Sequence, residues 1–272
     1  MIDSSHEQVP IAQPISSRSD RPLEPHARVI VIGASSGIGA ALVRNLARKG
    51  CYVAAVARRA DLLQKLSESI NAASPNGGRV FSYVHDVTHY DEIPTLFEQI
   101  VTDLSGVDVV IYNAGVMYAI DPAEYDFDKD RRQIEVNLLG AIAWLNMAAN
   151  RFQQLNTGQI VGISSVAGDR GRRNNPTYQT AKGGLSIFLE SLRNRLSQNG
   201  VNVTTIKPGF VKTDMLANAT RTTGAITAEA AADQIVAAIE RKRQVVYVPG
   251  WWRFVMLTIK SIPSFIFRRL NI

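Results

Sequence analysis

A tyrosine, a lysine and a serine occur at a spacing that suits proton transfer. Tyr178 and Lys182 lie four residues apart, so both fall on one face of the segment if it is helical. Ser165 precedes Tyr178 by thirteen residues and follows the apolar run 159–163. A free tyrosine has a pKa of about 10, and a neighbouring lysine cation lowers that pKa because it favours the phenolate. Together the three groups can pass a proton to or from a carbinol oxygen.

The composition fits one large domain without metal. The chain has 272 residues, of which 46% are hydrophobic, enough to bury a substantial core. No period of about 20–50 residues repeats, which excludes solenoids. The single cysteine, Cys51, excludes an internal disulfide and a cysteine-rich metal site. The four histidines show no spacing typical of a metal site, so we predict no metal.

The net charge of +6 is not accompanied by a nucleic-acid motif. Basic residues are scattered, apart from clusters at 170–173, 241–243 and the C-terminus, and net charge alone does not make a binding site. We therefore expect no nucleic-acid partner. Residues 1–26 hold four prolines and no periodic apolar pattern, which indicates a flexible arm. The arm lacks the basic start and apolar centre of a secretory signal, which predicts a cytoplasmic protein.

A strand, a glycine-rich turn and a helix follow the arm. The β-branched run 28–32 suits a buried strand, and a helical pattern covers 40–49. Between them the glycines can turn tightly and approach a pyrophosphate, whose charge the helix N-terminus meets. The spacing is G-x-x-x-G-x-G, and its position between strand and helix predicts the first half of a dinucleotide-binding unit. The expected cofactor contacts in this turn are Gly33, Ser35, Ser36, Gly37, Ile38 and Gly39.

Two arginines end the second predicted strand. An NAD enzyme typically carries an acid here, about 20 residues after the glycines, to bind the ribose 2′-hydroxyl. Arg58 and Arg59 stand there instead, and guanidinium groups suit a 2′-phosphate. The sequence therefore favours NADP(H) over NAD(H). The alternative is that the arginines are simply solvated, above all Arg59.

Strands and helices alternate along the rest of the chain. This alternation predicts an α/β fold: one Rossmann-like, doubly wound sheet of about seven parallel strands over residues 27–250, with helices on both faces. The predicted strands are 28–32, 52–57, 80–85, 107–111, 159–163, 201–206 and 245–248, and the helices between them include 61–73, 91–104, 129–154 and 228–242.

Polar residues follow several of these strands, where a doubly wound sheet contacts its ligand. Asp86 is placed to accept a hydrogen bond from the adenine amine, and Asn113 follows the next strand. Asn137 interrupts an apolar helical segment; it is either a structural amide or the holder of a water beside Lys182. The small and polar residues 214–226 are typical of a mobile substrate lid.

Over residues 27–250 the chain resembles the short-chain dehydrogenase/reductase family. The resemblance rests on motifs that occur in the family's order, from Gly33-x-x-x-Gly37-x-Gly39 through Asp86-Val87, Asn113-Ala114-Gly115, Asn137, Ser164-Ser165 and Tyr178-x-x-x-Lys182 to Pro208-Gly209. It implies an NAD(P)(H)-dependent enzyme that interconverts a secondary alcohol and a ketone. It also implies a homodimer or homotetramer, often formed through the helices before and after the serine strand.

The resemblance also assigns roles to residues. It makes Tyr178 the general acid for ketone reduction and Ser165 the hydrogen-bond partner of the carbonyl oxygen, while Ser164 is structural. It implies that Lys182 binds the nicotinamide ribose and tunes Tyr178, and that Asn137 anchors a water linking Lys182 to solvent. The remaining expected cofactor contacts are Asp86, Val87, Asn113, Ala114, Gly115, Pro208, Gly209, Val211 and Thr213, the last at the nicotinamide carboxamide.

Three arginines lie between Ser165 and Tyr178. Arg170, Arg172 and Arg173 beside the active site suit an anionic substrate such as a phosphate. The alternative is an exposed basic loop.

The C-terminal tail, residues 251–272, is aromatic, apolar and basic. Lys260 and Pro263 interrupt it, so it falls short of the roughly 20 apolar residues that span a bilayer. It suits either a membrane interface, with tryptophans and arginines at headgroup level, or packing on the subunit or an oligomer partner.

The arginine segment, the turn 207–211 and the tail are together similar to one branch of the family, the decaprenylphosphoryl-2-keto-erythro-pentose reductases. That likeness implies a keto-sugar on a polyprenyl phosphate as substrate. The alternatives are a generic carbonyl, steroid or 3-oxoacyl ketone reductase and, in a different class, a cofactor-binding scaffold that acts through its tail without catalysis.

Overall fold

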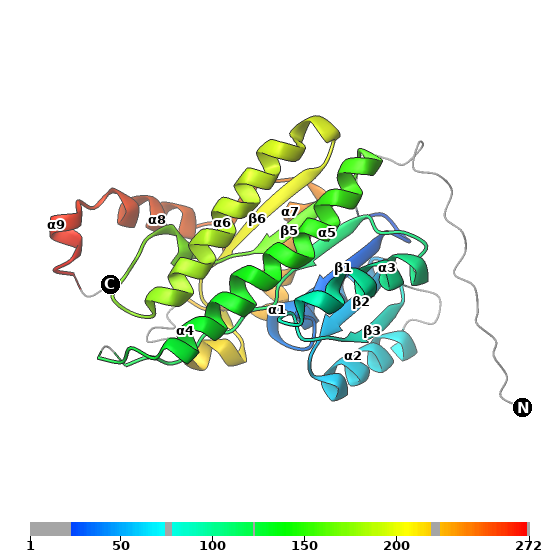
Figure 1. Cartoon of the computed structure of the whole chain (residues 1–272), viewed down its shortest axis with the longest axis horizontal. Coiled ribbons are helices and arrows are strands. Elements are labelled where there is room, and N and C mark those ends of the chain that lie inside the picture. The colour runs from blue at the N-terminus through cyan, green and yellow to red at the C-terminus, as the bar shows by residue number, and fades with distance from the viewer. Residues whose placement is uncertain (1–22, 74–77, 122, 219–223, 271–272) are drawn as a thin grey trace, which may run out of the picture.

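A seven-stranded parallel sheet lies between two layers of helices in the computed structural model, which describes residues 23–73, 78–121, 123–218 and 224–270 (Figure 1). The strand order is β3-β2-β1-β4-β5-β6-β9, and every neighbouring pair is parallel. The order reverses between β1 and β4, as in a doubly wound fold, so the predicted fold class is confirmed. The strands are β1 (Arg28–Ile32), β2 (Tyr52–Ala57), β3 (Val80–Val84), β4 (Val109–Tyr112), β5 (Gln159–Ile163), β6 (Asn202–Pro208) and β9 (Val245–Val248).

The central strands are apolar because both faces of the sheet are covered. Every residue of β1 is buried; Val29 and Val31 enter one core, and Ile30 and Ile32 enter the other. Such continuous apolar runs are typical of parallel sheets. The first core packs under α1 (Gly37–Arg48), α2 (Ala60–Ala73) and α7 (Ala228–Glu240), and the second under α3 (Ile93–Asp103), α5 (Gly140–Leu155) and α6 (Pro176–Leu196).

Two helices differ from the predicted ones. Helix α1 begins at Gly37, three residues earlier than expected, because the last two glycines of the turn already belong to the helix. The segment predicted as one helix over 129–154 is α4 (Phe127–Ile134), a π-helical turn (Glu135–Leu139) and α5. The π turn contains Asn137, and such turns are frequent at functional sites.

The two ends of the chain pack against the body where they are described. Leu23 is buried, and the backbone N–H of His26 donates to the carbonyl of Gly50 at 2.8 Å, so residues 23–26 of the predicted arm contact the domain; residues 1–22 lie outside the described part. The tail forms α8 (Trp252–Ser261) and α9 (Ser264–Phe267). Within the described ranges no helix is long and apolar enough to cross a membrane.

The predicted lid is only partly described. A short pair of parallel strands, β7 (Val211–Lys212) and β8 (Ile226–Thr227), frames it. A 3-10 turn, Asp214–Asn218, follows β7, and residues 219–223 lie outside the described part.

Candidate active site

One cavity of about 990 Å³ extends from the glycine turn to helix α8, at the carboxyl ends of the strands. It joins the predicted cofactor and catalytic residues into one site. Four predicted site residues do not line it: Gly39, Asp86, Asn137 and Arg170. Those that do are Gly33, Ser35, Ser36, Gly37, Ile38, Arg58, Arg59, Val87, Asn113, Ala114, Gly115, Ser165, Arg172, Arg173, Tyr178, Lys182, Pro208, Gly209, Val211 and Thr213.

The glycine turn has the geometry of a phosphate cradle. Gly33 and Gly37 adopt positive φ angles of 86° and 53°, which favour glycine. A Cβ on Gly33 would lie 2.5 Å from the backbone nitrogen of Ala114. Ser36 caps α1 without a side-chain hydrogen bond, so its hydroxyl leaves the N–H groups of the first turn to a ligand. These features fit the pyrophosphate of a dinucleotide.

Arg58 and Arg59 lie beside this turn and line the same cavity. Arg59 donates to the hydroxyl of Ser35 at 2.9 and 3.1 Å and to that of Ser36 at 2.5 Å. Arg58 is half-exposed, and its Nη1 lies 3.4 Å from a carboxylate oxygen of Asp86. Two cations and two hydroxyls thus gather at the end of β2, a group that suits an additional phosphate.

Asp86 is engaged within the protein instead of lining the cavity. Its carboxylate accepts from the backbone N–H and the hydroxyl of Thr88 at 3.0 and 2.8 Å, and from Nη2 of Arg132 at 2.9 Å. Burial raises the pKa of Asp86, but these bonds and the nearby arginines outweigh it and lower that pKa to about 2. Arg132 from α4 thereby holds the carboxylate at the end of β3, and the predicted role of Asp86 as acceptor for the adenine amine stays a prediction.

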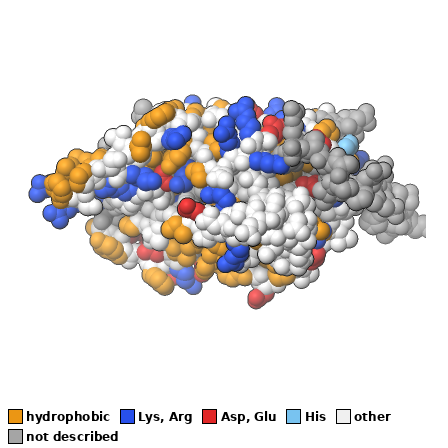
Figure 2. All heavy atoms as spheres, turned by 90° about the horizontal axis from the view of Figure 1, so that it is seen from above, with side chains coloured by type: hydrophobic (Ala, Val, Ile, Leu, Met, Phe, Trp, Pro, Cys, Tyr) orange, Lys and Arg blue, Asp and Glu red, His pale blue; other side chains and the backbone are white. Residues whose placement is uncertain are grey.

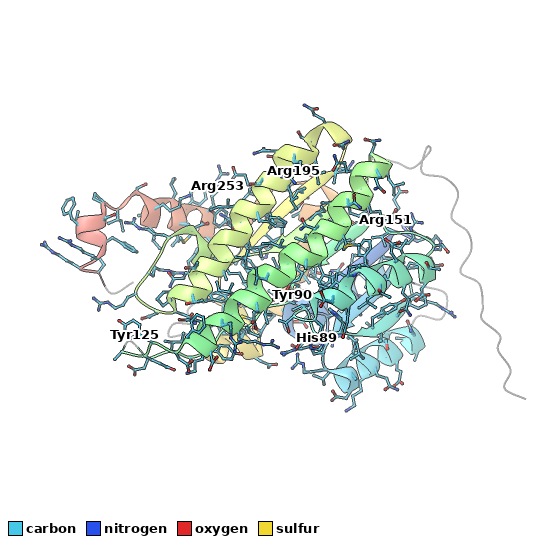
Figure 3. The ribbon with its side chains drawn as sticks, in the orientation of Figure 1. His89, Tyr90, Tyr125, Arg151, Arg195 and Arg253 are labelled. Carbon is cyan, nitrogen blue, oxygen red and sulfur yellow. The ribbon has the colours of Figure 1, made fainter. Side chains whose placement is uncertain are left out.

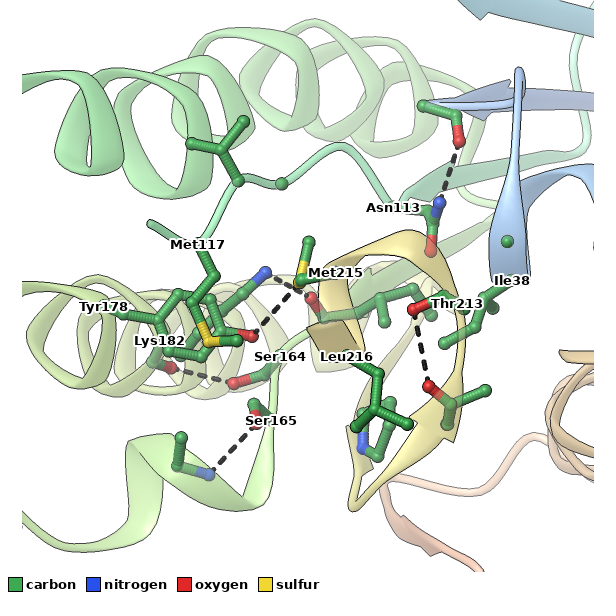
Figure 4. A pocket seen from close by; sticks show the side chains of 18 of the residues that line it. Ile38, Asn113, Met117, Ser164, Ser165, Tyr178, Lys182, Thr213, Met215 and Leu216 are labelled. Carbon is green, nitrogen blue, oxygen red and sulfur yellow. Dashed lines mark hydrogen bonds between the residues drawn. The ribbon is translucent and has the colours of Figure 1, made fainter. Parts of the chain in front are cut away.

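Tyr178, Lys182 and Ser165 converge on the cavity (Figure 4). Helix α6 begins at Pro176, and its cap residue Asn175 accepts from the backbone N–H of Tyr178 at 3.2 Å. Tyr178 and Lys182 are both buried, and the ammonium of Lys182 donates to the carbonyl of Ile163 at 3.0 Å. Nζ of Lys182 lies 5.9 Å from the centre of the Tyr178 ring. The spacing of four residues thus places both groups in one site.

The two serines before the loop differ in role. The Ser164 hydroxyl lies 2.8 Å from the carbonyl oxygen of Lys182, to which it donates, and 2.8 Å from the hydroxyl of Ser186, inside the protein. The Ser165 hydroxyl lines the cavity and accepts from the backbone N–H of Ala167 at 3.0 Å. Accepting that bond leaves the proton of the Ser165 hydroxyl for another partner.

Burial shifts the pKa values of the two ionisable groups toward their neutral forms. It raises the pKa of Tyr178, and the Ser165 hydroxyl and the Arg172 guanidinium oppose that rise. It lowers the pKa of Lys182 from 10.5 to about 8. The sequence predicts that Lys182 lowers the pKa of Tyr178; in the structure burial raises that pKa, and the groups that oppose the rise are Ser165 and Arg172. A pKa above the ordinary value of about 10 leaves the Tyr178 hydroxyl protonated at neutral pH.

Asn137 is a satisfied buried amide. Its Nδ2 donates to the carbonyls of Val116 at 2.8 Å and Gln133 at 2.9 Å, and its Oδ1 lies 3.2 Å from the backbone nitrogen of Val116. A Cβ on Gly115 would lie 2.7 Å from Asn137 Oδ1 and 3.4 Å from Lys182 Nζ, so only glycine fits between them. Asn137 thereby fixes the cavity wall beside Lys182, and its role toward water stays a prediction.

The three predicted substrate arginines separate in the structure. Arg172 and Arg173 line the cavity. Arg170 turns away: Nη1 donates to the carbonyls of Ile259 and Lys260, and the guanidinium lies 3.8 Å from the ring centre of Phe267. Arg170 therefore holds the C-terminal end of α8 and does not line the cavity, and its contact with a substrate stays a prediction.

Arg172 is available to a ligand. The side chain of Gln179 accepts from the backbone N–H of Arg172 and donates to the carbonyl of Asn174, which holds the loop over the cavity. Within the described ranges the guanidinium of Arg172 makes no hydrogen bond or ion pair with another side chain. A half-buried guanidinium whose N–H donors are not used within the described structure can bind an anion, although the charges of Asp169 and Tyr178 also act on it.

An apolar wall completes the cavity, and our sequence analysis did not assign it. Met215 in the predicted lid lies against the active site, with its sulfur 4.0 Å from the Tyr178 hydroxyl (Figure 4). The tail supplies Trp252, Val255 and Ile259. Their spacing of three and four residues in the sequence indicates one face of a helix. The wall residues are Met117, Ile120, Phe210, Met215, Leu216, Trp252, Val255 and Ile259.

Replacing Lys182 by methionine tests the burial of the ammonium. The folded-state pKa of about 8 lies below the ordinary 10.5, so between these values the unfolded chain binds more protons than the folded chain. The quantity to measure is the unfolding free energy of the wild type minus that of Lys182→Met. We expect this difference to increase by up to about 1.4 kcal/mol per pH unit above pH ~8. Urea denaturation over this range measures the difference. Lys65→Met, at an exposed position of α2, is the control. If the difference from the wild type were independent of pH for both variants, the lowered pKa of Lys182 would be contradicted.

Comparisons with known proteins show to which family the chain belongs. A model of the family described as short chain dehydrogenase matches residues 27–224. An uncharacterized oxidoreductase of Mycobacterium tuberculosis is 30% identical over 244 residues, 89% of this chain and 96% of the relative. One from Myxococcus xanthus is 38% identical over 188 residues, 69% of this chain and 73% of the relative.

Solved structures share the fold. A short-chain dehydrogenase/reductase from Mycobacterium ulcerans is 23% identical and covers 88% of this chain and 97% of its own, with a TM-score of 0.76. The actinorhodin polyketide ketoreductase with NADPH is 24% identical and covers 83% of this chain and 97% of its own, with a TM-score of 0.74. With the family model and the glycine turn, serine, tyrosine and lysine in place, the chain belongs to the short-chain dehydrogenase/reductase family and is an NAD(P)-dependent oxidoreductase.

Proposed function

We propose that the protein reduces a ketone to a secondary alcohol with Tyr178 as the general acid. The observation that carries this proposal is a buried tyrosine hydroxyl beside a serine hydroxyl and a lysine ammonium, in the cavity that contains the glycine turn. The Ser165 hydroxyl donates to the carbonyl oxygen, and Tyr178 transfers its proton to that oxygen. When bound, the reduced cofactor would supply a hydride to the carbonyl carbon. The ammonium of Lys182, which also binds the nicotinamide ribose, stabilises the phenolate that Tyr178 becomes after it gives up the proton.

Replacing Tyr178 by phenylalanine tests the acid. We expect kcat to fall by about 10²–10⁴, because the proton donor is lost, while NADPH still binds. Ser165→Ala should lower kcat by about a hundredfold, since one hydrogen bond to the oxyanion is removed. Ser164→Ala, whose hydroxyl bonds inside the protein, is the matched control. Unchanged turnover in Tyr178→Phe would mean that the catalytic assignment is wrong and would favour a non-catalytic scaffold.

We also propose that NADP(H) is preferred over NAD(H). Arg58 and Arg59 with the hydroxyls of Ser35 and Ser36 offer charge-assisted hydrogen bonds to a 2′-phosphate. The fold neighbour with 24% identity is a ketoreductase with NADPH, which is consistent with this proposal.

Arg58→Ala tests the cofactor preference. Without the guanidinium we expect the Kd for NADPH to rise about tenfold or more, roughly 1.4 kcal/mol, while the Kd for NADH stays unchanged. Fluorescence titration with each cofactor measures both constants. Arg48→Ala removes an equal charge from the exposed C-terminal end of α1 and serves as the control. An equal loss of affinity for NADH would show that Arg58 does not recognise the 2′-phosphate.

For the substrate, we propose a ketone that joins an anionic group to an apolar part. The unpaired guanidinium of Arg172 and the neighbouring Arg173 suit the anion, and the wall of Met117, Phe210 and Val255 suits the apolar part. A keto-sugar on a polyprenyl phosphate has both features. The runner-up is a generic carbonyl, steroid or 3-oxoacyl ketone reductase, whose neutral substrates would not need Arg172.

Arg172→Met distinguishes these substrates. For a phosphorylated ketone we expect KM to rise about tenfold or more, because a charged hydrogen bond is lost; for a neutral ketone KM should stay unchanged. Steady-state kinetics with the two ketones measure the difference. Arg195→Met, at the far end of α6 and exposed (Figure 3), is the control. A KM that does not change for the phosphorylated ketone would favour the neutral substrates.

We further propose a homodimer or homotetramer in the cytoplasm, as is common in the family. Two exposed apolar side chains support an interface on the helices around β5: Leu139 before α5 and Ile187 on α6.

A further inference from the structure

Helix α8 forms part of the active-site wall with its inner face. Trp252 and Met256 are buried, and Val255 and Ile259 line the cavity. The indole of Trp252 lies so close to Gly209 that a Cβ there would come within 1.8 Å of its Nε1. The helix is therefore fixed against the site.

The opposite face of α8 has no covering in the described structure. Trp251, Phe254 and Leu257 recur every three residues along the helix and are 45%, 69% and 64% exposed. Phe265 of α9 is 60% exposed and continues the apolar surface. Figure 2 shows hydrophobic and basic side chains gathered at the end of the molecule where α8 and α9 lie in Figure 1. Exposed apolar patches of this kind mark interaction sites.

The charged side chains of the tail itself all have one sign. Residues 249–270 contain no aspartate or glutamate. Four exposed cations flank the apolar residues: Arg253 (Figure 3), Lys260, Arg268 and Arg269. A symmetric contact with a second copy of this surface would bring these cations together, which is unfavourable. An anionic surface would neutralise them.

We propose that the tail surface, defined as the exposed faces of α8 and α9 with these four cations, docks on an anionic lipid bilayer. Helix α8 has ten residues, about 15 Å, which is too short to span the hydrocarbon core but suits a helix lying in the interface. The docked face is the reverse side of the cavity wall, so the active site lies beside the membrane. This placement lets the apolar part of a lipid-linked ketone enter the cavity along α8, a consequence that rests on the proposed function.

Vesicle co-sedimentation of the full-length protein tests the docking. The probes are vesicles of phosphatidylcholine alone and of phosphatidylcholine with phosphatidylglycerol. We expect binding to the anionic vesicles only, released by salt because the attraction is partly electrostatic. The double variant Phe254→Ser/Leu257→Ser should bind at least about tenfold more weakly, and Arg268→Glu/Arg269→Glu should lose the preference for anionic lipid.

The control is Val84→Ser, which removes an equally exposed apolar side chain from β3, at the opposite edge of the sheet from β9; it should bind like the wild type. The proposal would be overturned if the wild-type protein did not bind anionic vesicles. It would also be overturned if the Phe254→Ser/Leu257→Ser variant bound them as tightly as the wild type. A wild-type oligomer that this double variant dissociates, without vesicle binding, would instead make the surface a contact between copies.

The vesicle assay needs neither cofactor nor turnover, so it separates docking from catalysis. NADPH binding and reduction of a water-soluble ketone should be the same in Phe254→Ser/Leu257→Ser and in the wild type, because neither side chain lines the cavity. Vesicle binding without any ketone reduction would reject the proposed function and leave the docking surface in place.

Discussion

The contact between the glycine turn and the end of β4 is the constraint on which the site depends. The side-chain amide of Asn113 donates to the carbonyl of Gly33 at 2.8 Å, and a Cβ on Gly39 would lie 2.0 Å from that same carbonyl oxygen. Helix α1 can start this close to β4 only because glycines stand at these positions. The reversal of strand order then opens one cavity between the two halves of the sheet. Because of this, the cofactor turn and the Tyr178 region share a single site.

Burial of that cavity determines the state of its ionisable groups. It raises the pKa of Tyr178 and lowers that of Lys182, since low polarity disfavours either charge. The Ser165 hydroxyl, the Arg172 guanidinium and the carbonyl of Ile163 provide the polar partners that make such burial tolerable. With a pKa of about 8, Lys182 is still mostly an ammonium at pH 7, so a cation remains beside the Tyr178 ring.

The loop after Ser165 connects the cavity with the C-terminal tail. The side chain of Asp169 is buried and accepts from the ammonium of Lys207 at 2.5 Å and the hydroxyl of Tyr247 at 2.6 Å, which ties the loop to β6 and β9. Arg170, the next residue, holds the C-terminal end of α8. The serine, the arginine loop and the tail helix therefore form one connected wall, and the cavity is enclosed by segments nearly a hundred residues apart in the chain.

The sequence by itself determined the sheet, the glycine turn and the pairing of Tyr178 with Lys182, because each depends on neighbours in the chain: β-branched runs form buried strands, and a spacing of four defines one helix face. Only the tertiary structure decided the partners of the long charged side chains. Arg132 reaches Asp86 across 46 residues, and Arg170 reaches the carbonyl of Ile259 across 89. No local pattern encodes these contacts, since a flexible arginine binds whichever acceptor the packing of the helices brings within its reach.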